Sequence, residues 1–243
     1  MKVEGKNAVR ELIKTDAEID KILIANGLKD PESRKLLNEI RVKGYKVQFA
    51  DGFILDKESE SKRHQGFIAF ASDYKYADLK DIIADCDKKG NDSLVVVLDE
   101  ILDPHNLGSI IRVCECGGAD GLIIPERRSA QVTETVIRIS EGGANHVKIA
   151  RVTNINSAIK ELQQNGFWAT GAELGGENLY KADLTGKLCL VIGGEGTGIK
   201  KLTKEICDRI VTIPMKGKVN SLNASVACGV VLFEALRQRD WKK

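Results

Sequence analysis

The sequence lacks the features of a secreted or membrane protein. Its N-terminal segment has no apolar core of the kind found in secretory signals. No apolar run approaches the roughly 20 residues needed to cross a bilayer. The six cysteines include no CxxC pair, and several lie in apolar stretches. We therefore expect a cytoplasmic protein whose cysteines are reduced and buried.

The sequence also has little excess charge and no pattern of metal ligands. The 37 Lys and Arg residues are nearly balanced by 35 Asp and Glu residues, so the net charge is only +2. A nucleic-acid binder of this composition needs local basic patches. The three histidines are isolated from other ligands, so we expect no metal site. Hydrophobic residues make up 42% of the chain, which excludes global disorder.

The 243 residues indicate one large domain or two modest ones. Residues 1–72 alternate short helical and strand patterns, which predicts a compact α/β unit with a parallel or mixed sheet. The predicted segments are helix 7–14, strand 19–25, a helix opened by Pro31, and strands 45–50 and 66–71. Residues 73–92 are charged, with a predicted helix at 76–86, and they end in a polar turn. We expect them to be the linker.

From Ser93 the pattern is that of an α/β domain, 93–243, with a mostly parallel sheet. The apolar run 93–99 is typical of a strand that is buried on both faces. Further strands are predicted at 118–125, 147–152, 166–173, 187–196 and 208–215, and helices after the polar turn 103–109 and at 131–140, 155–164 and 221–239. In open parallel sheets, ligands bind beyond the carboxyl ends of the strands. Three such ends here have unusual sequences.

The first is DPHNLGSIIRVCECGG, residues 103–118. Asn106 or Ser109 is a candidate cap for the helix that follows. Arg112 is expected in or near the first turns, where an arginine gains nothing from the helix dipole. This indicates a ligand-directed role for Arg112, although a solvated arginine is the simpler alternative.

The second is LVIGGEGTGIKK, residues 190–201, a strand that runs into four glycines. Such glycines allow close approach of the backbone to a ligand, and a flexible turn is the alternative. The loop is not a phosphate-binding loop, because Ile199 occupies the position of its lysine. The dinucleotide fingerprint GxGxxG is also absent.

The third is IPMKGKVNSLNASVACG, residues 213–229. Asn220, Ser221, Asn223 and Ser225 crowd the start of a predicted helix. Small polar side chains serve as helix caps and as ligand donors equally well. The four together exceed what one helix start needs.

These three segments, in this order, resemble the three motifs of the SpoU (TrmH) family of RNA ribose methyltransferases. The resemblance reaches the N-terminus, where VEGKNAVRELI and ESKRHQGFIAF are similar to the substrate-binding domain of bacterial 23S rRNA guanosine methyltransferases. It implies an L30e-like domain at 1–72 and a SPOUT domain at 93–243 with a C-terminal trefoil knot. It also implies a homodimer that uses S-adenosylmethionine.

The resemblance assigns roles to residues of the three segments. It implies Asn106, Arg112, Glu195, Ser221 and Asn223 as catalytic residues. The implied cofactor-binding residues are Gly193, Gly194, Gly196, Ile213 and Leu222. The segment RISEGGANH departs from the expected pattern at Glu141 and Gly143, and their role stays open.

The expected reaction is methylation of a ribose 2'-hydroxyl, with a guanosine of 23S rRNA as the target. Arg112 would stabilise the developing alkoxide and bind the adjacent phosphate. Asn106 would position Arg112 or the ribose, and Glu195 would orient the arginine or accept the proton. The expected RNA-binding residues are Lys62, Arg63, His64, Arg127 and Arg128, together with Lys216 and Lys218 in the third motif. Transfer RNA is the alternative substrate, and a non-catalytic RNA-binding protein is the alternative of another class.

Overall fold

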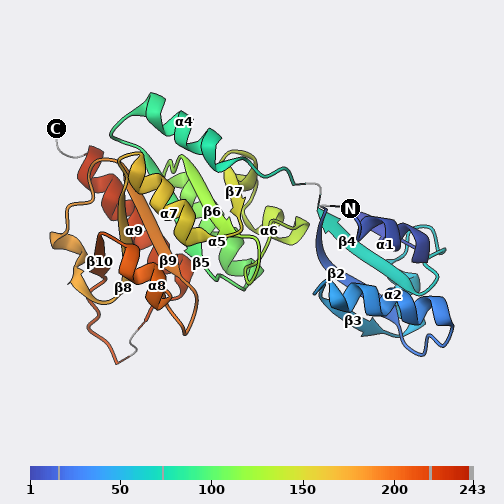
Figure 1. Cartoon of the computed structure of the whole chain (residues 1–243). Helices are drawn as coiled ribbons and strands as arrows, with labels where there is room; N and C mark the ends of the chain where they lie inside the picture. Colours follow the sequence, from blue (N-terminus) through green and yellow to red (C-terminus); the bar gives the residue numbers. More distant parts are fainter. Residues whose placement is uncertain (16, 73, 219–220, 241–243) are drawn as a thin grey trace. The chain divides into compact units, whose positions relative to one another are not determined.

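The computed structural model describes residues 1–15, 17–72, 74–218 and 221–240, which form two compact units (Figure 1). The first unit comprises residues 1–75 with 132–134, and the second comprises 76–131 with 135–243. Within the described residues, no helix is long and apolar enough to cross a bilayer.

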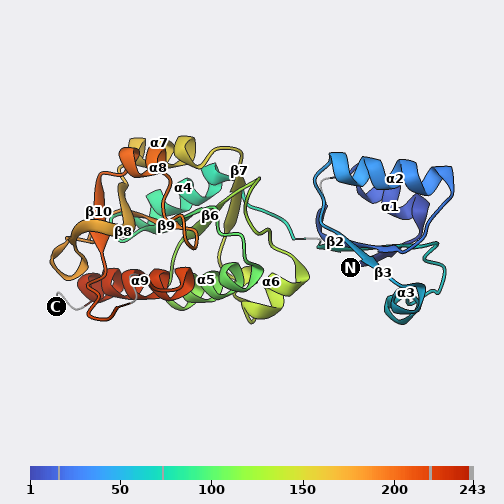
Figure 2. The same ribbon diagram turned by 90° about the horizontal axis from the view of Figure 1, so that it is seen from below.

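The first unit is a mixed four-stranded sheet in the order β1-β4-β2-β3. Strands β2 and β3 are parallel, and β4 runs antiparallel to β1 and β2. Helices α1 and α2 cover one face of this sheet, and α3 lies on the other (Figure 2). The elements are β1 (Lys2–Glu4), α1 (Lys6–Leu12), β2 (Glu18–Ala25), α2 (Pro31–Val42), β3 (Val47–Ala50), α3 (Gly52–Glu58) and β4 (Phe67–Ser72).

Most of this unit follows the sequence pattern, and β1 and α3 are the exceptions. Asp30 caps α2 by accepting a hydrogen bond from the Ser33 backbone N–H, and Pro31 occupies the first turn as predicted. Helix α3 was not predicted because only Leu55 of its seven residues is buried. A helix this short with one buried residue has no amphipathic period to detect.

The second unit has six strands, all parallel, in the order β10-β8-β9-β5-β6-β7. Helices α5 and α9 cover one face, and α4, α7 and α8 cover the other (Figure 2). The elements are α4 (Leu79–Lys89), β5 (Leu94–Asp99), α5 (Pro104–Cys116), β6 (Gly121–Pro125), α6 (Glu134–Ile139), η1 (Gly143–Asn145), β7 (Ile149–Val152), α7 (Ile155–Gln164), β8 (Trp168–Asn178), η2 (Leu179–Lys181), β9 (Leu188–Gly193), α8 (Lys201–Ile206), β10 (Arg209–Thr212) and α9 (Ala224–Asp240).

The stretch 73–92, which was expected to join the domains, contains α4. Ile82, Ile83 and Cys86 of this helix belong to the hydrophobic core of the second unit. Each of these three side chains is less than a tenth exposed. Helix α4 is therefore part of the second unit's packing.

The capping prediction for the helix after β5 was wrong. Asp103 caps α5 by accepting a hydrogen bond from the His105 backbone N–H at 3.0 Å, whereas Asn106 and Ser109 lie inside the helix. Helix α5 therefore starts earlier than expected, and Arg112 lies in its third turn. The expected conflict between Arg112 and the helix dipole does not arise, because the dipole acts within the first turn.

The cysteines are free thiols, and four of them are buried: Cys86, Cys114, Cys189 and Cys228. Burial raises the pKa of Cys86 to about 11, so this thiol is inert at neutral pH. Cys116 is exposed, contrary to the expectation that the cysteines are buried.

Candidate active site

A cavity of about 500 Å³ lies where the chain leaves β9 and β10 and enters α9, beside residues 172–174 in the middle of β8. This size is within the range of small-molecule sites, which is about 300–1,000 Å³. The cavity is lined by residues 172–174, 192–198, 211, 213, 215, 221–224 and 227. The second and third of the unusual segments, which are distant in sequence, thus form one site.

The glycine-rich segment after β9 is packed against neighbouring backbone. A Cβ added at Gly193 would lie 2.2 Å from the carbonyl carbon of Gly198. One added at Gly194 would lie 2.5 Å from the carbonyl oxygen of Glu100. Real Cβ atoms do not approach backbone this closely, so the wall of the cavity requires glycine at both positions.

Three polar side chains meet at the cavity: Glu195 and Asn223 line it, and Asn106 of α5 hydrogen-bonds to both. Asn106 Nδ2 donates to Glu195 Oε1 at 2.8 Å, and Asn223 Nδ2 donates to the same oxygen at 2.6 Å. Asn223 Nδ2 also donates to Asn106 Oδ1 at 2.8 Å. Both amides therefore hold the Glu195 carboxylate in one orientation. Within the described residues, no hydrogen bond reaches the second oxygen of Glu195.

Asn223 also caps helix α9. Its Oδ1 accepts hydrogen bonds from the Ser225 backbone N–H at 2.9 Å and from Ser225 Oγ at 2.6 Å. Asn223 therefore caps α9 and also hydrogen-bonds to Glu195 beside the cavity. Asn220 lies outside the described residues.

The other predicted residues of the second and third segments line the same cavity. They are Gly193, Gly194, Gly196, Ile213, Ser221 and Leu222. Leu222 is 38% exposed, so its side chain is free to contact a ligand.

Arg112 is not among the residues that line the cavity. Its Nη1 donates to Glu141 Oε1 at 2.8 Å, and the side chain is 53% exposed. Arg112 lies six residues after Asn106 in α5, so the two side chains point about 120° apart around the helix. Glu141 adopts a left-handed φ of 48°, and a Cβ at Gly143 would lie 3.4 Å from Arg112 Cα. Glu141 and Gly143, the two departures from the family pattern, therefore both lie next to Arg112.

Comparison with known proteins identifies the family. The SpoU rRNA Methylase family matches residues 93–233, which is more than half of the chain. The chain belongs to this family. A second match, to the domain described as RNA 2'-O ribose methyltransferase substrate binding, covers residues 2–77. The SpoU match begins at the strand β5 and contains every residue of the site described above.

Similar proteins align with the SpoU chain over nearly its whole length. It is 38% identical over 239 residues to a Bacillus subtilis protein assigned to the TrmH family of tRNA/rRNA methyltransferases, covering 98% of this chain and 96% of that protein. It is 41% identical over 240 residues to a similarly assigned Staphylococcus aureus protein, again covering 98% and 96%. The SpoU methyltransferase AviRb from Streptomyces viridochromogenes, solved with AdoMet, has a TM-score of 0.63 and 26% identity, covering 98% of this chain and 90% of that chain. The A. aeolicus TrmH/SpoU tRNA modifying enzyme has a TM-score of 0.56 and 31% identity, covering 68% of this chain and 83% of that chain.

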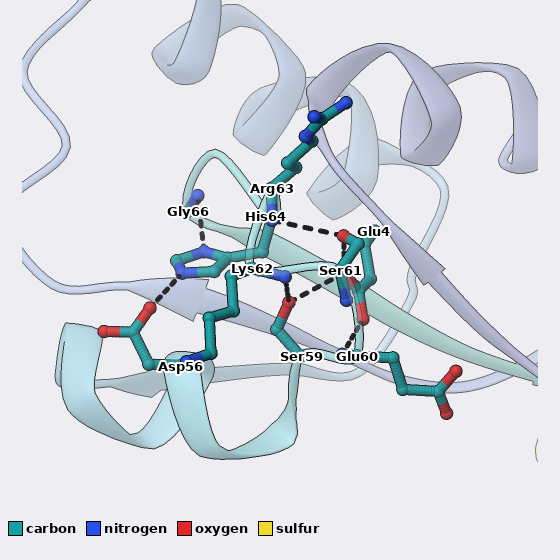
Figure 3. Close-up of polar contacts among 9 residues, drawn as sticks. All are labelled: Glu4, Asp56, Ser59, Glu60, Ser61, Lys62, Arg63, His64 and Gly66. Atoms are coloured by element: carbon teal, nitrogen blue, oxygen red, sulfur yellow. Dashed lines mark hydrogen bonds and ion pairs between the residues drawn. The ribbon is translucent and has the colours of Figure 1, made fainter.

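The basic residues predicted to bind RNA lie on both units of this SpoU protein. Lys62, Arg63 and His64 are in the loop between α3 and β4 of the first unit (Figure 3). Arg127 and Arg128 are exposed directly after β6 in the second unit. Arg127 and Arg128 therefore lie at the edge of the sheet where the strands have their carboxyl ends. The cavity borders the same edge.

Sequence reasoning missed Glu173, which lines the cavity at the end of the predicted strand 166–173. Its Oε2 accepts a hydrogen bond from the Ile199 backbone N–H at 2.7 Å, and this contact holds the glycine-rich segment. The signal that was available is an acidic residue at a strand's carboxyl end. That signal is common in α/β folds and identifies no site alone.

Proposed function

We propose that this protein transfers a methyl group from S-adenosylmethionine to a ribose 2'-hydroxyl of RNA, with a guanosine of 23S rRNA as the target. The observation that carries the proposal is the cluster of Asn106, Glu195 and Asn223 at the rim of the cavity. Two amides that orient one carboxylate beside a cavity of cofactor size are suited to positioning and deprotonating a hydroxyl.

The chemistry of the cavity fits S-adenosylmethionine. Ile192, Ile213 and Leu222 provide apolar surface for an adenine ring, and the glycine-rich segment provides backbone polar groups. Glu173 provides a carboxylate that attracts a positive charge. When bound, S-adenosylmethionine supplies an electrophilic methyl group on a positively charged sulfur. The residues proposed to hold it are Gly193, Gly194, Gly196, Ile213 and Leu222.

In this mechanism the ribose hydroxyl is activated by groups of the protein. The hydroxyl is a weak nucleophile until its proton is removed. Glu195 is the proposed acceptor, through the carboxylate oxygen that the two amides leave unoccupied, at about 3 Å from the hydroxyl. Ser221, at the rim of the same cavity, is the proposed further contact to the ribose.

Arg112 is proposed to bind the phosphate next to the reacting ribose and to stabilise the developing alkoxide. A guanidinium binds a phosphate in a bidentate manner. The ion pair with Glu141 is exposed, so an RNA phosphate can displace Glu141 at low energetic cost.

We propose that a homodimer brings an Arg112 side chain to the cavity, which Arg112 of the same chain does not line. Val226 and Phe233 of α9 are about half exposed and seven residues apart, so they share one apolar face of the helix. We propose that α9 and the adjacent α5 form the interface, so that Arg112 of the partner subunit completes the site. Sedimentation should give a mass near twice 26.6 kDa, and a monomer at micromolar concentration would contradict this.

Two further features implied by the resemblance remain part of the proposal. They are the trefoil knot formed by the segment that leads into α9, and the L30e-like class of the first unit. The proposed division of labour is that the first unit, with residues 1–72 and Lys62, Arg63 and His64, selects the RNA, and that Arg127 and Arg128 bind it next to the site.

We propose ribosomal RNA as the target, in place of transfer RNA, because the chain contains the first unit. The A. aeolicus tRNA modifying enzyme aligns with only 68% of this chain, whereas the domain matched at residues 2–77 is an additional substrate-binding domain. Mapping of 2'-O-methyl sites in ribosomal and transfer RNA from cells with and without the gene tests the proposal. A missing methyl group in transfer RNA alone would reassign the target, and the absence of any change would favour a non-catalytic RNA-binding protein.

A further inference from the structure

The loop of residues 194–198, which follows β9 and carries Glu195, is short and rich in glycine. Its two ends meet, because the Gly198 backbone N–H donates to the Gly194 carbonyl at 3.0 Å. The three residues between these ends are exposed, so their side chains do not pack the loop against the protein. Glycine also loses more conformational freedom on folding than any other residue. The backbone that carries Glu195 therefore has to be held from outside the loop.

Two carboxylates hold the chain directly after this loop. Asp99, the last residue of β5, accepts a hydrogen bond from the Lys200 backbone N–H through Oδ2 at 2.9 Å. Glu173, in the middle of β8, accepts one from the Ile199 backbone N–H through Oε2 at 2.7 Å. Strands β5 and β8 flank β9 on its two sides (Figure 1). Two consecutive backbone N–H groups are therefore bound from both neighbouring strands.

The burial of Asp99 is explained by this contact. Asp99 is 1% exposed, and burying a carboxyl group is costly unless hydrogen bonds compensate for the lost water. Within the part of the chain that the structure describes, the Lys200 backbone N–H is the one hydrogen-bond donor to this carboxyl group. Asp99 is not among the residues that line the cavity. A contact with the cofactor therefore does not account for a carboxyl group at this position, whereas the contact with the loop does.

Glu173 also packs against the loop itself. A Cβ added at Gly198, whose φ of 64° is left-handed, would lie 2.1 Å from Glu173 Oε2. The carboxylate therefore occupies the space that any side chain at position 198 would need. Its other oxygen, Oε1, accepts a hydrogen bond from the Leu174 backbone N–H at 3.1 Å, which helps to orient the carboxylate.

The position of Glu195 matters because its second carboxylate oxygen is the proposed proton acceptor. Asn106 and Asn223 bind Oε1 and orient the carboxylate, but these bonds do not hold the backbone of Glu195. The residues held by the two carboxylates follow Glu195 by four and five positions, at the end of a loop that is closed on itself. A misplacement of about 1 Å at a catalytic group can cost about 100-fold in rate.

We propose that Asp99 and Glu173 are positioning residues for methyl transfer, which fix the loop of residues 194–198 so that Glu195 reaches the ribose hydroxyl. The inference rests on the proposed function, since it takes Glu195 as the proton acceptor. Asp99 acts through the loop alone. Glu173 lines the cavity as well, so it acts through the loop and through the attraction of its charge for the cofactor.

The first experiment compares Asp99→Ala with Asp99→Asn in the full-length protein. Single-turnover transfer is measured with labelled S-adenosylmethionine and 23S rRNA transcribed in vitro, both at saturating concentration. Asp99→Ala removes the acceptor for the Lys200 N–H and should lower the rate by about 10- to 100-fold. Asp99→Asn keeps an acceptor oxygen and should recover most of the rate. A wild-type rate in Asp99→Ala, or equal losses in the two variants, would overturn the role of Asp99.

The matched control is Asp120→Ala, which acts at the opposite end of the same strand. Asp120 Oδ2 accepts a hydrogen bond from the backbone N–H of Leu94, the first residue of β5, at 2.8 Å. The control therefore removes the same kind of contact from β5, and it should lower the thermal stability while transfer stays at the wild-type rate. If Asp120→Ala lost as much transfer as Asp99→Ala, any weakening of β5 would be sufficient and the proposal would be overturned.

The second experiment separates the positioning of Glu195 from a general effect on the fold. Asp99→Ala is combined with Glu195→Gln, and the rate of the double variant is compared with those of the two single variants. If Asp99 acts through Glu195, the double variant should transfer at the rate of Glu195→Gln, with no further loss. Losses that multiply would show that Asp99 acts independently of Glu195, which contradicts the proposal.

The third experiment applies the same two measurements to Glu173→Ala. Saturating cofactor offsets the lost attraction for the cofactor, so the remaining loss of rate, about tenfold or more, reports the position of the loop. The loss should vanish in the Glu195→Gln background, and a wild-type rate in Glu173→Ala would exclude Glu173 as a positioning residue. If Asp99→Ala does not fold, Asp99→Asn and Glu173→Ala decide: a large loss in the first or none in the second would overturn the proposal.

Failure of this inference is distinguishable from failure of the proposed function. A wild-type rate in Glu195→Gln would exclude Glu195 as the proton acceptor, and a wild-type protein that never transfers a methyl group would contradict the proposed function. A reduced rate in Glu195→Gln, together with wild-type rates in Asp99→Ala and Glu173→Ala, would overturn the positioning role alone.

Discussion

Replacement of Arg112 by alanine separates the two halves of the proposed mechanism. Arg112 is half exposed, lies outside the residues that line the cavity, and is paired with Glu141. Its loss should therefore leave the cavity and the bound cofactor unaffected. It should remove the charge that is proposed to bind the phosphate next to the reacting ribose.

The expected sizes of the two effects follow from this geometry. The ion pair of Arg112 and Glu141 has both side chains more than half exposed, so its loss should change the free energy of unfolding by only about 0–1 kcal/mol. Losing one preorganised charge that stabilises a transition state typically costs about 100- to 1,000-fold in rate. Arg112→Lys should not restore the rate, because a point charge cannot reproduce the bidentate fork.

The measurement is single-turnover methylation with labelled cofactor, combined with calorimetry of cofactor binding. The matched control is Glu141→Gln, which removes the partner of Arg112 and should keep at least wild-type turnover. Wild-type turnover by Arg112→Ala would exclude Arg112 from the mechanism. Loss of cofactor binding in step with activity would instead show that Arg112 belongs to the cofactor pocket.

Three further outcomes are expected. Glu195→Gln should lower single-turnover transfer by about 100-fold or more with cofactor affinity nearly unchanged, and equal turnover would exclude Glu195 as the proton acceptor. Gly193→Ala should lower the free energy of unfolding by about 1–3 kcal/mol and reduce cofactor binding, because its Cβ would lie 2.2 Å from the Gly198 carbonyl carbon. The control for both measurements is Gly52→Ala, because nothing lies within 4 Å of the Cβ that it adds. A chain that begins at Tyr76 keeps α4 in its core and should bind S-adenosylmethionine in calorimetry while losing RNA affinity. If this chain folds but does not bind the cofactor, the proposal that the first unit serves RNA selection and the second unit cofactor binding is contradicted.

The regular elements of both units were largely predictable because their burial gives a local pattern, either a continuous apolar run or a helical period. The apolar run at 93–99 is β5, buried at every position, and the pattern at 155–164 is α7 over the same residues. Helix α3 was not predictable, because its apolar Phe53 and Ile54 are exposed and give no buried face. The start of α5 was misjudged because Asp103, Asn106 and Ser109 are all common caps, and a local pattern does not rank them.

The site was predictable only in its parts. The resemblance named Asn106, Glu195 and Asn223, but nothing in the sequence indicates that all three share hydrogen bonds, since 89 residues separate the first two and 117 separate the outer pair. The partner of Arg112 was likewise unknown. Glu141 had been noted only as a departure from the family pattern, and the structure places it on Arg112.

The sequence by itself determined the class of fold, the order of most elements and the family, because hydrophobic period and short motifs are local properties of the chain. Only the tertiary structure decided which of the marked residues touch. The carboxyl ends of β5 and β9 meet the middle of β8, because parallel pairing brings Asp99 opposite Gly193 and Ala172 opposite Ile192. That pairing depends on the packing of the whole sheet, and it is what brings Asn106, Glu195 and Asn223 to one oxygen atom while leaving Arg112 outside the cavity.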